Sequence, residues 1–246
     1  MEPTYYRKYI LEATEVNSAD RLKNSRLLAI IQEVAGEHSA LLGTDRDALE
    51  SKRLFWAVIR HRVQITRLPR SGETIHVHTW PMPTTRTAYP RATVAYDQEN
   101  RELFRCISLW VLMDMSTRAM VLPGRSGVEV AGCLQGNELS LPGSLLPQKL
   151  PNAEQRTVRF SDLDINGHMN NCRYMEWVDD LLPSDFHKTH DPKELLVCYL
   201  SEARESENMD ICWEVSQQGT LRVDAQRSGG EMSAGHSRVF AAQVQF

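Results

Sequence analysis

The chain has 246 residues, of which 41% are hydrophobic and 24% charged, so it can bury a core as one large domain or as two small ones. The first residues carry acids and tyrosines rather than a basic segment and an apolar run. No stretch approaches the ~18 consecutive apolar residues of a membrane helix. The net charge is −4, and no dense basic run is interleaved with aromatics, so nucleic acid is not indicated as a partner. We expect a cytoplasmic protein with no membrane span.

The cysteines and histidines do not indicate a metal centre. The five cysteines are an odd number without a CxxC pair, and they read as reduced thiols that lie mostly in the core. His76 and His78 would share a strand face, but no third ligand is evident nearby. The sequence therefore implies no cofactor.

In the first half, a strand, a helix and a set of strands follow one another. The opening strand is predicted over Tyr5–Glu12, and a helix over Ser25–Leu42 ends before Gly43, a natural C-cap. The helical stripe consists of Leu27, Ile31, Val34, His38 and Leu41. Four strands are predicted from alternating hydrophobicity, over Phe55–Thr66, Glu73–Trp80, Thr87–Tyr96 and Leu103–Asp114.

The second half repeats this pattern after a connector rich in proline and glycine. Its opening strand is predicted over Arg156–Phe160. The helix carries the stripe Tyr174, Trp177, Val178 and Leu181, with Asn170 or Asn171 as its N-cap and Pro183 as its stop. The four strands are predicted over Leu195–Ala203, Met209–Val215, Thr220–Gln226 and Ser237–Phe246.

A strand, a central helix and a curved antiparallel sheet, present twice, predict an α+β double hotdog fold. In this fold each sheet wraps around its own helix, and the helix covers one face of the apolar strands. We expect an N-terminal hotdog domain over residues 1–121, a connector over residues 122–153 and a C-terminal hotdog domain over residues 154–246.

The segment from Ser161 to Asn171 combines groups that suit acyl transfer. Asp164, Asn166 and His168 are two residues apart, so an extended backbone would place all three on one side. A carboxylate and an imidazole can transfer protons, while an amide near a helix start can stabilise an oxyanion. The competing interpretation is a capped helix start that follows a solvated polar loop.

The internal repeat favours the catalytic interpretation. With the two helix starts aligned, Asp164, Asn166 and His168 stand opposite Asn17, Ala19 and Arg21. A purely structural cap should survive in both copies, whereas a catalytic set is needed in only one.

Glu202 is a fourth candidate, near the end of the first long strand after the second helix. A carboxylate there is often only a solvated strand terminus. A partly buried carboxylate beside a second one would instead have a raised pKa and could act as a base.

Asp-Leu-Asp-Ile-Asn-Gly-His-Met-Asn-Asn, followed by Cys-Arg-Tyr-Met-Glu-Trp, resembles the active-site segment of bacterial and plant acyl-acyl-carrier-protein (acyl-ACP) thioesterases. Tyr-Leu-Ser-Glu-Ala resembles the second motif of this family. The resemblance implies catalytic roles for Asp164, Asn166, His168 and Glu202. Plant members have a cysteine after the glutamate, whereas this chain has Ala203, which excludes a thiol nucleophile at that position.

The resemblance implies hydrolysis of fatty acyl-ACP to free fatty acid, without a cofactor and with acyl carrier protein as the partner. Asn166 and the amides of residues 169–171 would hold the thioester carbonyl. Asp164 or Glu202 would activate water or attack directly, and His168 would orient or protonate. The acyl chain would lie in the N-terminal domain, whose own site is degenerate. A homodimer is compatible with the sequence.

Three alternatives remain open. A hotdog acyl-CoA thioesterase shares the chemistry and differs in the carrier. A double-hotdog hydratase would have the wider spacing D-x-N-x-x-H. A non-catalytic acyl-binding regulator would have no reason to keep the three groups.

Docking of an acidic carrier needs a basic surface, and the first half carries the excess of basic residues. Arg60 and Arg62 would share one face of a strand by alternation. We expect this face to be the docking surface, with an ordinary solvated strand face as the alternative.

Overall fold

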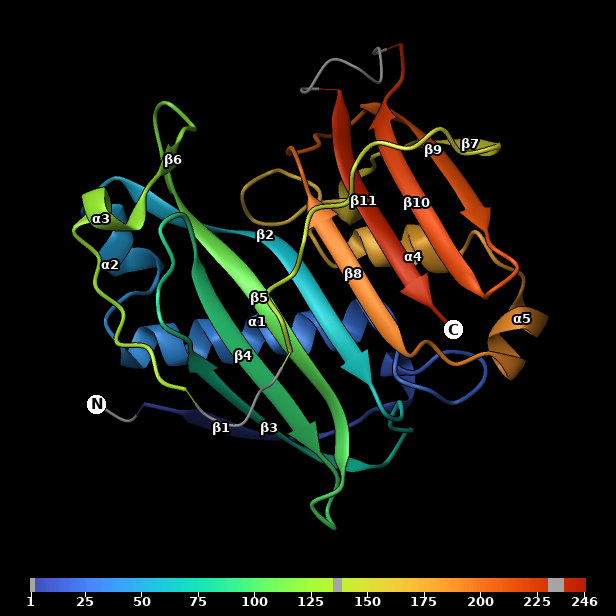
Figure 1. Ribbon diagram of the computed structural model, residues 1–246, viewed down its shortest axis with the longest axis horizontal. Coiled ribbons are helices and arrows are strands. Elements are labelled where there is room, and N and C mark those ends of the chain that lie inside the picture. Colours follow the sequence, from blue (N-terminus) through green and yellow to red (C-terminus); the bar gives the residue numbers. More distant parts are fainter. Residues whose placement is uncertain (1–2, 135–138, 230–236) are drawn as a thin grey trace. The chain divides into compact units, whose positions relative to one another are not determined.

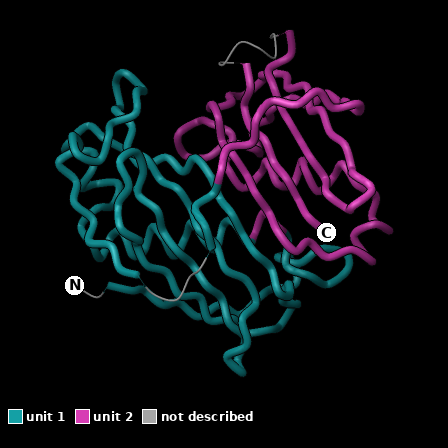
Figure 2. The backbone as a smooth tube through the Cα atoms, in the orientation of Figure 1, with its two compact units in different colours: residues 1–23, 27–142 teal, residues 24–26, 143–246 magenta. Residues whose placement is uncertain are grey.

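The computed structural model describes residues 3–134, 139–229 and 237–246. Part of the predicted connector, residues 135–138, lies outside the described residues. The chain divides into two compact units (Figure 2). The first unit comprises residues 1–23 and 27–142, and the second comprises residues 24–26 and 143–246.

The first unit is an antiparallel sheet with a helix along one face (Figure 1). The order of its strands is β1-β3-β4-β5-β2, and the short strand β6 (Met120–Val121) pairs with β5. The bounds of the main elements are β1 Tyr5–Ile10, α1 Asn24–Leu41, β2 Leu54–Ile65, β3 Thr74–Pro81, β4 Tyr89–Tyr96 and β5 Glu102–Asp114.

Helix α1 supplies one side of the core of the first unit. Leu27, Ile31 and Val34 are fully buried, as the helical stripe predicts, and His38 is buried with them. Burying each such aliphatic side chain contributes roughly 1.5–3 kcal/mol. The prediction is wrong for Leu41, which is 64% exposed because it is the last residue of the helix.

The second unit has the same strand order, β7-β9-β10-β11-β8, again antiparallel around a helix. The residues on the inner side of α4 are buried as predicted, and a buried ion pair joins Asp224 to Arg238 through bonds of 2.8 and 2.7 Å. The bounds of its elements are β7 Asn152–Thr157, α4 Arg173–Asp179, β8 Glu194–Tyr199, β9 Asn208–Val215, β10 Thr220–Arg227 and β11 Arg238–Gln245.

The α+β double hotdog prediction is confirmed, and eight of the ten predicted strands agree with the observed ones within two residues at each end. The strand predicted over Arg156–Phe160 lies instead at Asn152–Thr157, and the strand predicted over Leu195–Ala203 ends at Tyr199, so Glu202 lies beyond it.

Three short helices were not predicted. They are α2 (Arg46–Glu50), α3 (Pro123–Ser126) and α5 (Ser184–Thr189). Pro183 follows the end of α4, and it also precedes the first residue of α5. Within the described ranges, no helix combines the length and the apolar character that a membrane crossing requires.

The predicted docking face on β2 is not an open basic surface. The guanidinium of Arg60 donates to the carbonyl of Pro142 at 3.4 Å, and that of Arg62 donates to the hydroxyl of Ser140. Both side chains are only partly exposed. The connector therefore engages these two arginines, because its carbonyl and hydroxyl oxygens lie within their reach.

Candidate active site

The loop that carries the predicted catalytic residues is a tight hairpin turn. Leu163 and Met169 form an antiparallel bridge, and between them the amide of Asp164 donates to the carbonyl of His168 at 2.8 Å. The amide of Gly167 donates to the carbonyl of Asp164 at 3.0 Å, and Gly167 has a φ of 74°. The prediction of an extended backbone is therefore wrong, because glycine at this position lets the chain reverse in a three-residue hairpin loop.

The carboxylate of Asp164 holds this turn together. Its Oδ1 accepts the amide of Asn166 at 2.8 Å and the amide of His168 at 3.3 Å. Its Oδ2 lies 3.3 Å from the side-chain nitrogen of Asn166. Aspartate side chains commonly accept the backbone amide of the residue two positions further along the chain. Here the carboxylate of Asp164 also orients the side-chain amide of Asn166.

The imidazole of His168 meets the carboxylate of Glu202, with 3.3 Å between Nε2 and Oε2. The two segments are adjacent because the amide of Met169 donates to the carbonyl of Ala203 at 2.8 Å and His168 bridges to Arg204. The side chain of His168 is 17% exposed and that of Glu202 is 43% exposed. The pair is thus partly buried and remains accessible to water.

Arg227 is a residue of this region that the sequence did not reveal. It lies at the end of β10 and donates to the carbonyl of Glu202 and, at 3.0 Å, to the hydroxyl of Ser201. These bonds hold the backbone that presents the Glu202 carboxylate. No spacing pattern marks Arg227, because its contact depends on strand pairing that is distant in sequence.

Two of the three helix-start amides of the predicted oxyanion site, those of residues 169–171, are already used in backbone bonds. The amide of Met169 is bonded to Ala203, and that of Asn170 donates to the carbonyl of Asp162 at 2.8 Å. The prediction is wrong for these two groups, since both hydrogens are already used. The predicted N-cap is also displaced: Cys172 occupies the N-cap position, and the Asn170 side chain accepts its amide at 2.9 Å.

The first unit contains the same turn without the same chemistry. Val16 and Leu22 form the equivalent bridge, and the amide of Asn17 donates to the carbonyl of Arg21 at 2.8 Å. Asn17 Oδ1 accepts the amides of Ala19 and Arg21, as Asp164 accepts those of Asn166 and His168. The aligned pairing read from the sequence is therefore supported. Both units keep an acceptor that forms the turn, whereas Asn166 and His168 of the second unit are replaced by Ala19 and Arg21 in the first.

The described residues include no group of three or more histidines, cysteines and acids arranged as a metal-binding set. His76 contacts the hydroxyl of Tyr6, and the ring of His78 packs edge-on against that of Tyr6.

Burial raises the pKa of three of the five cysteines, Cys106, Cys133 and Cys212. Burial raises the pKa of Cys106 to about 12, and the position after Glu202 is the fully buried Ala203. Cys172 is partly buried at the start of α4. A thiolate is the reactive form of cysteine, so a thiol with a raised pKa is inert.

If the chain hydrolyses a thioester, as the resemblance implies, Cys172→Ala and Cys198→Ala variants should retain that activity within about threefold, and alkylation of accessible thiols should leave it measurable. Steady-state rates, with circular dichroism to establish folding, test this. Complete loss of turnover in a folded Cys172→Ala enzyme would contradict a mechanism without a thiol.

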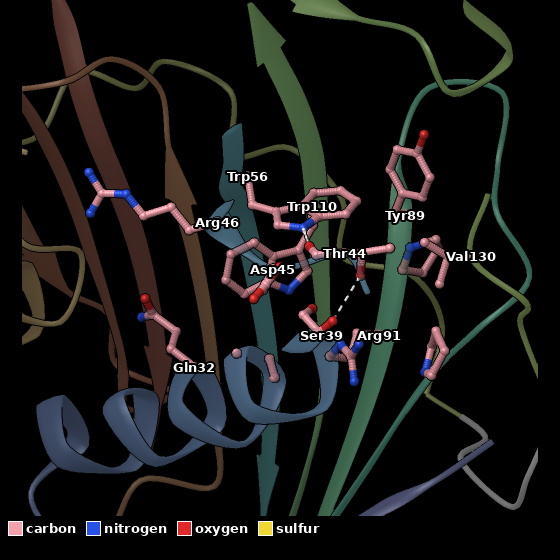
Figure 3. Close-up of a pocket in the computed structure, with 14 residues that line it drawn as sticks. Gln32, Ser39, Thr44, Asp45, Arg46, Trp56, Tyr89, Arg91, Trp110 and Val130 are labelled. Carbon is pink, nitrogen blue, oxygen red and sulfur yellow. Dashed lines mark hydrogen bonds between the residues drawn. The ribbon is translucent and has the colours of Figure 1, made fainter. Parts of the chain in front are cut away.

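The first unit contains a cavity of about 350 Å³, within the range of small-molecule sites. Aromatic rings and prolines form much of its lining (Figure 3). Trp56 and Tyr89 pack edge to face, with 4.9 Å between ring centroids. Other lining residues are Gln32 and Ser39 of α1, Pro81 of β3, Arg91 of β4 and Trp110 of β5.

The fold and the site define a double-hotdog protein whose second unit carries a carboxylate–amide pair on one turn and an imidazole–carboxylate pair between that turn and the segment after β8. Residues 2–122 match the N-terminal domain of the acyl-ACP thioesterases, and residues 147–239 match their C-terminal domain. The chain belongs to the acyl-ACP thioesterase family.

Two plant relatives are named as acyl carrier protein thioesterases. Oleoyl-acyl carrier protein thioesterase 1 of Arabidopsis thaliana is 24% identical over 84% of this chain and 62% of its own length. Palmitoyl-acyl carrier protein thioesterase of Cuphea hookeriana is 26% identical over 81% of this chain and 51% of its own length. The chain thus spans between about half and three-fifths of the length of these relatives.

Solved structures share the fold. The crystal structure of an acyl-ACP thioesterase from Bacteroides thetaiotaomicron has a TM-score of 0.90 and 22% identity, over 99% of this chain and 98% of its own. The 12:0-ACP thioesterase from Umbellularia californica has a TM-score of 0.81 and 22% identity, over 100% and 97%.

Proposed function

We propose that this protein hydrolyses fatty acyl-ACP to free fatty acid and acyl carrier protein, with Asp164, Asn166, His168 and Glu202 as its catalytic set. The observation that carries the proposal is the 3.3 Å contact between His168 and Glu202. His168 lies on a turn whose equivalent in the first unit has the same backbone hydrogen bonds but no imidazole. Membership of the family supports the same reaction.

In the proposed mechanism, Glu202 and His168 together activate water. Asp164 accepts three hydrogen bonds within the turn, which use most of its acceptor sites, whereas Glu202 is the more exposed carboxylate. The pair takes a proton as the water oxygen bonds to the thioester carbon. His168 then returns that proton to the sulfur as the carbon–sulfur bond breaks, which releases the carrier thiol and the fatty acid.

Asn166 is the proposed donor to the thioester oxygen. Its side-chain nitrogen has two hydrogens, and the contact with Asp164 uses one of them. The second can donate to the oxygen as negative charge develops on it. Asp164 acts in this scheme as a positioning residue that fixes both the turn and the amide.

The cavity of the first unit is the proposed site of the acyl chain. Its apolar lining suits methylene groups. The unit that contains it corresponds to the proposed N-terminal hotdog domain, residues 1–121, and the connector that follows. This unit lacks the catalytic set. The proposed C-terminal domain, residues 154–246, carries the chemistry.

We predict that the protein releases free acid from acyl-ACP with a kcat/KM at least about tenfold higher than from the matched acyl-CoA. The experiment uses octanoyl to hexadecanoyl chains on both carriers and quantifies the free acid. A His168→Ala enzyme that is folded by circular dichroism serves as the control and should show only background release. The opposite carrier preference would favour an acyl-CoA thioesterase, and no release from either carrier would favour a non-catalytic acyl-binding protein.

A further inference from the structure

Helix α1 contains a glycine in its interior, where glycine makes a helix less stable than alanine does. Gly36 lies five residues before Leu41, the last residue of the helix. It is therefore too far from the end to serve as a C-cap, which is the usual place for a glycine. Gly43, just after the helix, has the left-handed φ of 66° that is typical of such an ending.

The fold itself does not require glycine at position 36. Its φ lies outside the left-handed region. A Cβ at this position would have no heavy atom of the described residues within 4 Å, apart from its chain neighbours and the helix backbone. Gly132 is different, because a Cβ there would lie 2.4 Å from the backbone of Met82. An alanine at position 36 would thus fit without strain.

The open space beside Gly36 belongs to the cavity of the first unit. Gly36 lines this cavity together with Gln32, about one turn earlier, and Ser39, nearly one turn later (Figure 3). Residues three and four positions apart lie on the same face of a helix. Gly36 is also exposed, so no packing within the protein offsets its cost to the helix. At this residue the wall of the cavity is bare helix backbone.

We propose that Gly36 is a specificity-determining residue, which lets the acyl chain pass over the backbone of α1 and so sets the longest chain that the cavity accepts. The inference rests on the proposed function, because it concerns the acyl chain of that reaction. Glycine is the residue that permits close approach of a ligand to the backbone. A side chain at this position would occupy volume that methylene groups of the ligand need.

The test replaces Gly36 with larger residues and measures kcat/KM for acyl-ACP substrates from octanoyl to octadecanoyl. In Gly36→Leu the new side chain would lean toward Gln32, because helical side chains point back toward the N-terminus. We expect kcat/KM for the longest chain that the wild type hydrolyses well to fall about tenfold or more. The preferred length should shorten by about two to four carbons. Gly36→Ala should have a smaller effect in the same direction.

Ala40→Leu is the matched control. Ala40 is exposed on α1 one turn beyond Gly36, and it lies outside the lining of the cavity. This variant adds the same side chain to the same helix, and it should leave the preferred chain length unchanged.

Thermal unfolding of Gly36→Ala tests whether the fold needs the glycine. We expect Tm to rise by about 1–4 °C, because alanine stabilises an exposed helix position that glycine weakens. A lower Tm than that of the wild type would show that glycine serves the fold rather than the ligand, and it would overturn the inference.

Free fatty acids provide a second measurement that does not depend on hydrolysis, since a ligand of the folded protein raises Tm. The longest acid that stabilises the wild type should stabilise Gly36→Leu less, whereas shorter acids should stabilise both alike. Equal stabilisation of the two proteins by acids of every length would contradict the role of Gly36.

The outcomes separate this inference from the proposed function. If Gly36→Leu and Ala40→Leu hydrolyse all chain lengths in the same proportions, Gly36 faces only water; the inference is then wrong and the proposed function stands. If the wild type hydrolyses no acyl-ACP, the proposed function fails, and the fatty-acid shifts still decide whether Gly36 limits the chain. If no fatty acid stabilises the wild type either, both are wrong.

Discussion

Glu202→Gln is expected to lower kcat for acyl-ACP hydrolysis by about a thousandfold, because the amide cannot take a proton from the attacking water. Gln has nearly the same shape, so the turn, the contact with His168 and the bond from Arg227 to the backbone carbonyl should persist. The measurement is kcat under saturating substrate, with circular dichroism as the test of folding.

Glu205→Gln is the matched control for this experiment, since Glu205 is an exposed carboxylate three residues further along the chain. It should retain full activity. The double variant His168→Gln with Glu202→Gln should be little slower than either single variant, because residues that act as a unit show non-additive losses. A Glu202→Gln enzyme within about tenfold of the wild type would remove Glu202 from the proton transfer.

Asp164→Asn is expected to preserve the fold and to lower kcat by about a hundredfold. The fold should persist because Asn17 holds the equivalent turn of the first unit with the same two backbone bonds. The rate should fall because an amide nitrogen would face the side-chain nitrogen of Asn166, and the donor would lose its orientation. Thermal unfolding and kcat are the two measurements.

Two further variants test the separation of turn and chemistry. Asn17→Asp makes the reverse exchange at the equivalent position of the first unit, and it should leave kcat unchanged. Asp164→Ala removes the acceptor for two amides, and the loss should cost about 1–3 kcal/mol of stability in addition to activity. A strong loss of stability in Asp164→Asn, or full activity in that variant, would contradict the positioning role.

The long elements of this fold can be predicted from sequence, because the spacing of their hydrophobic residues indicates which face of each strand or helix is buried. The run around Ile107 in β5 and the stripe of α1 are examples. Short elements such as α3 show no periodic spacing of hydrophobic residues, since four residues complete only one helical turn. The chain breakers near α3 indicate only a connector.

The candidate site could be predicted in composition but not in geometry. The spacing of Asp164, Asn166 and His168 identifies the groups. The αL conformation at Gly167 turns the segment into a hairpin, and the amides of residues 169 and 170 donate to backbone carbonyls there. The approach of Glu202 depends on the bridge between residues 168 and 204, which local spacing does not encode. Arg227 could not be found for the same reason.

The shared strand order has a consequence for how each unit folds. In the first unit, β3, β4 and β5 follow one another as hairpins, and so do β9, β10 and β11 in the second. Strand β2 pairs with β5, so the pair of Ile65 with Phe104 encloses strands β3 and β4. Closing such a loop costs entropy before its contacts are gained. We therefore expect each meander to form first and the strands before and after the helix to join it later, because β1 pairs with β3 and β7 with β9 across still longer stretches of chain.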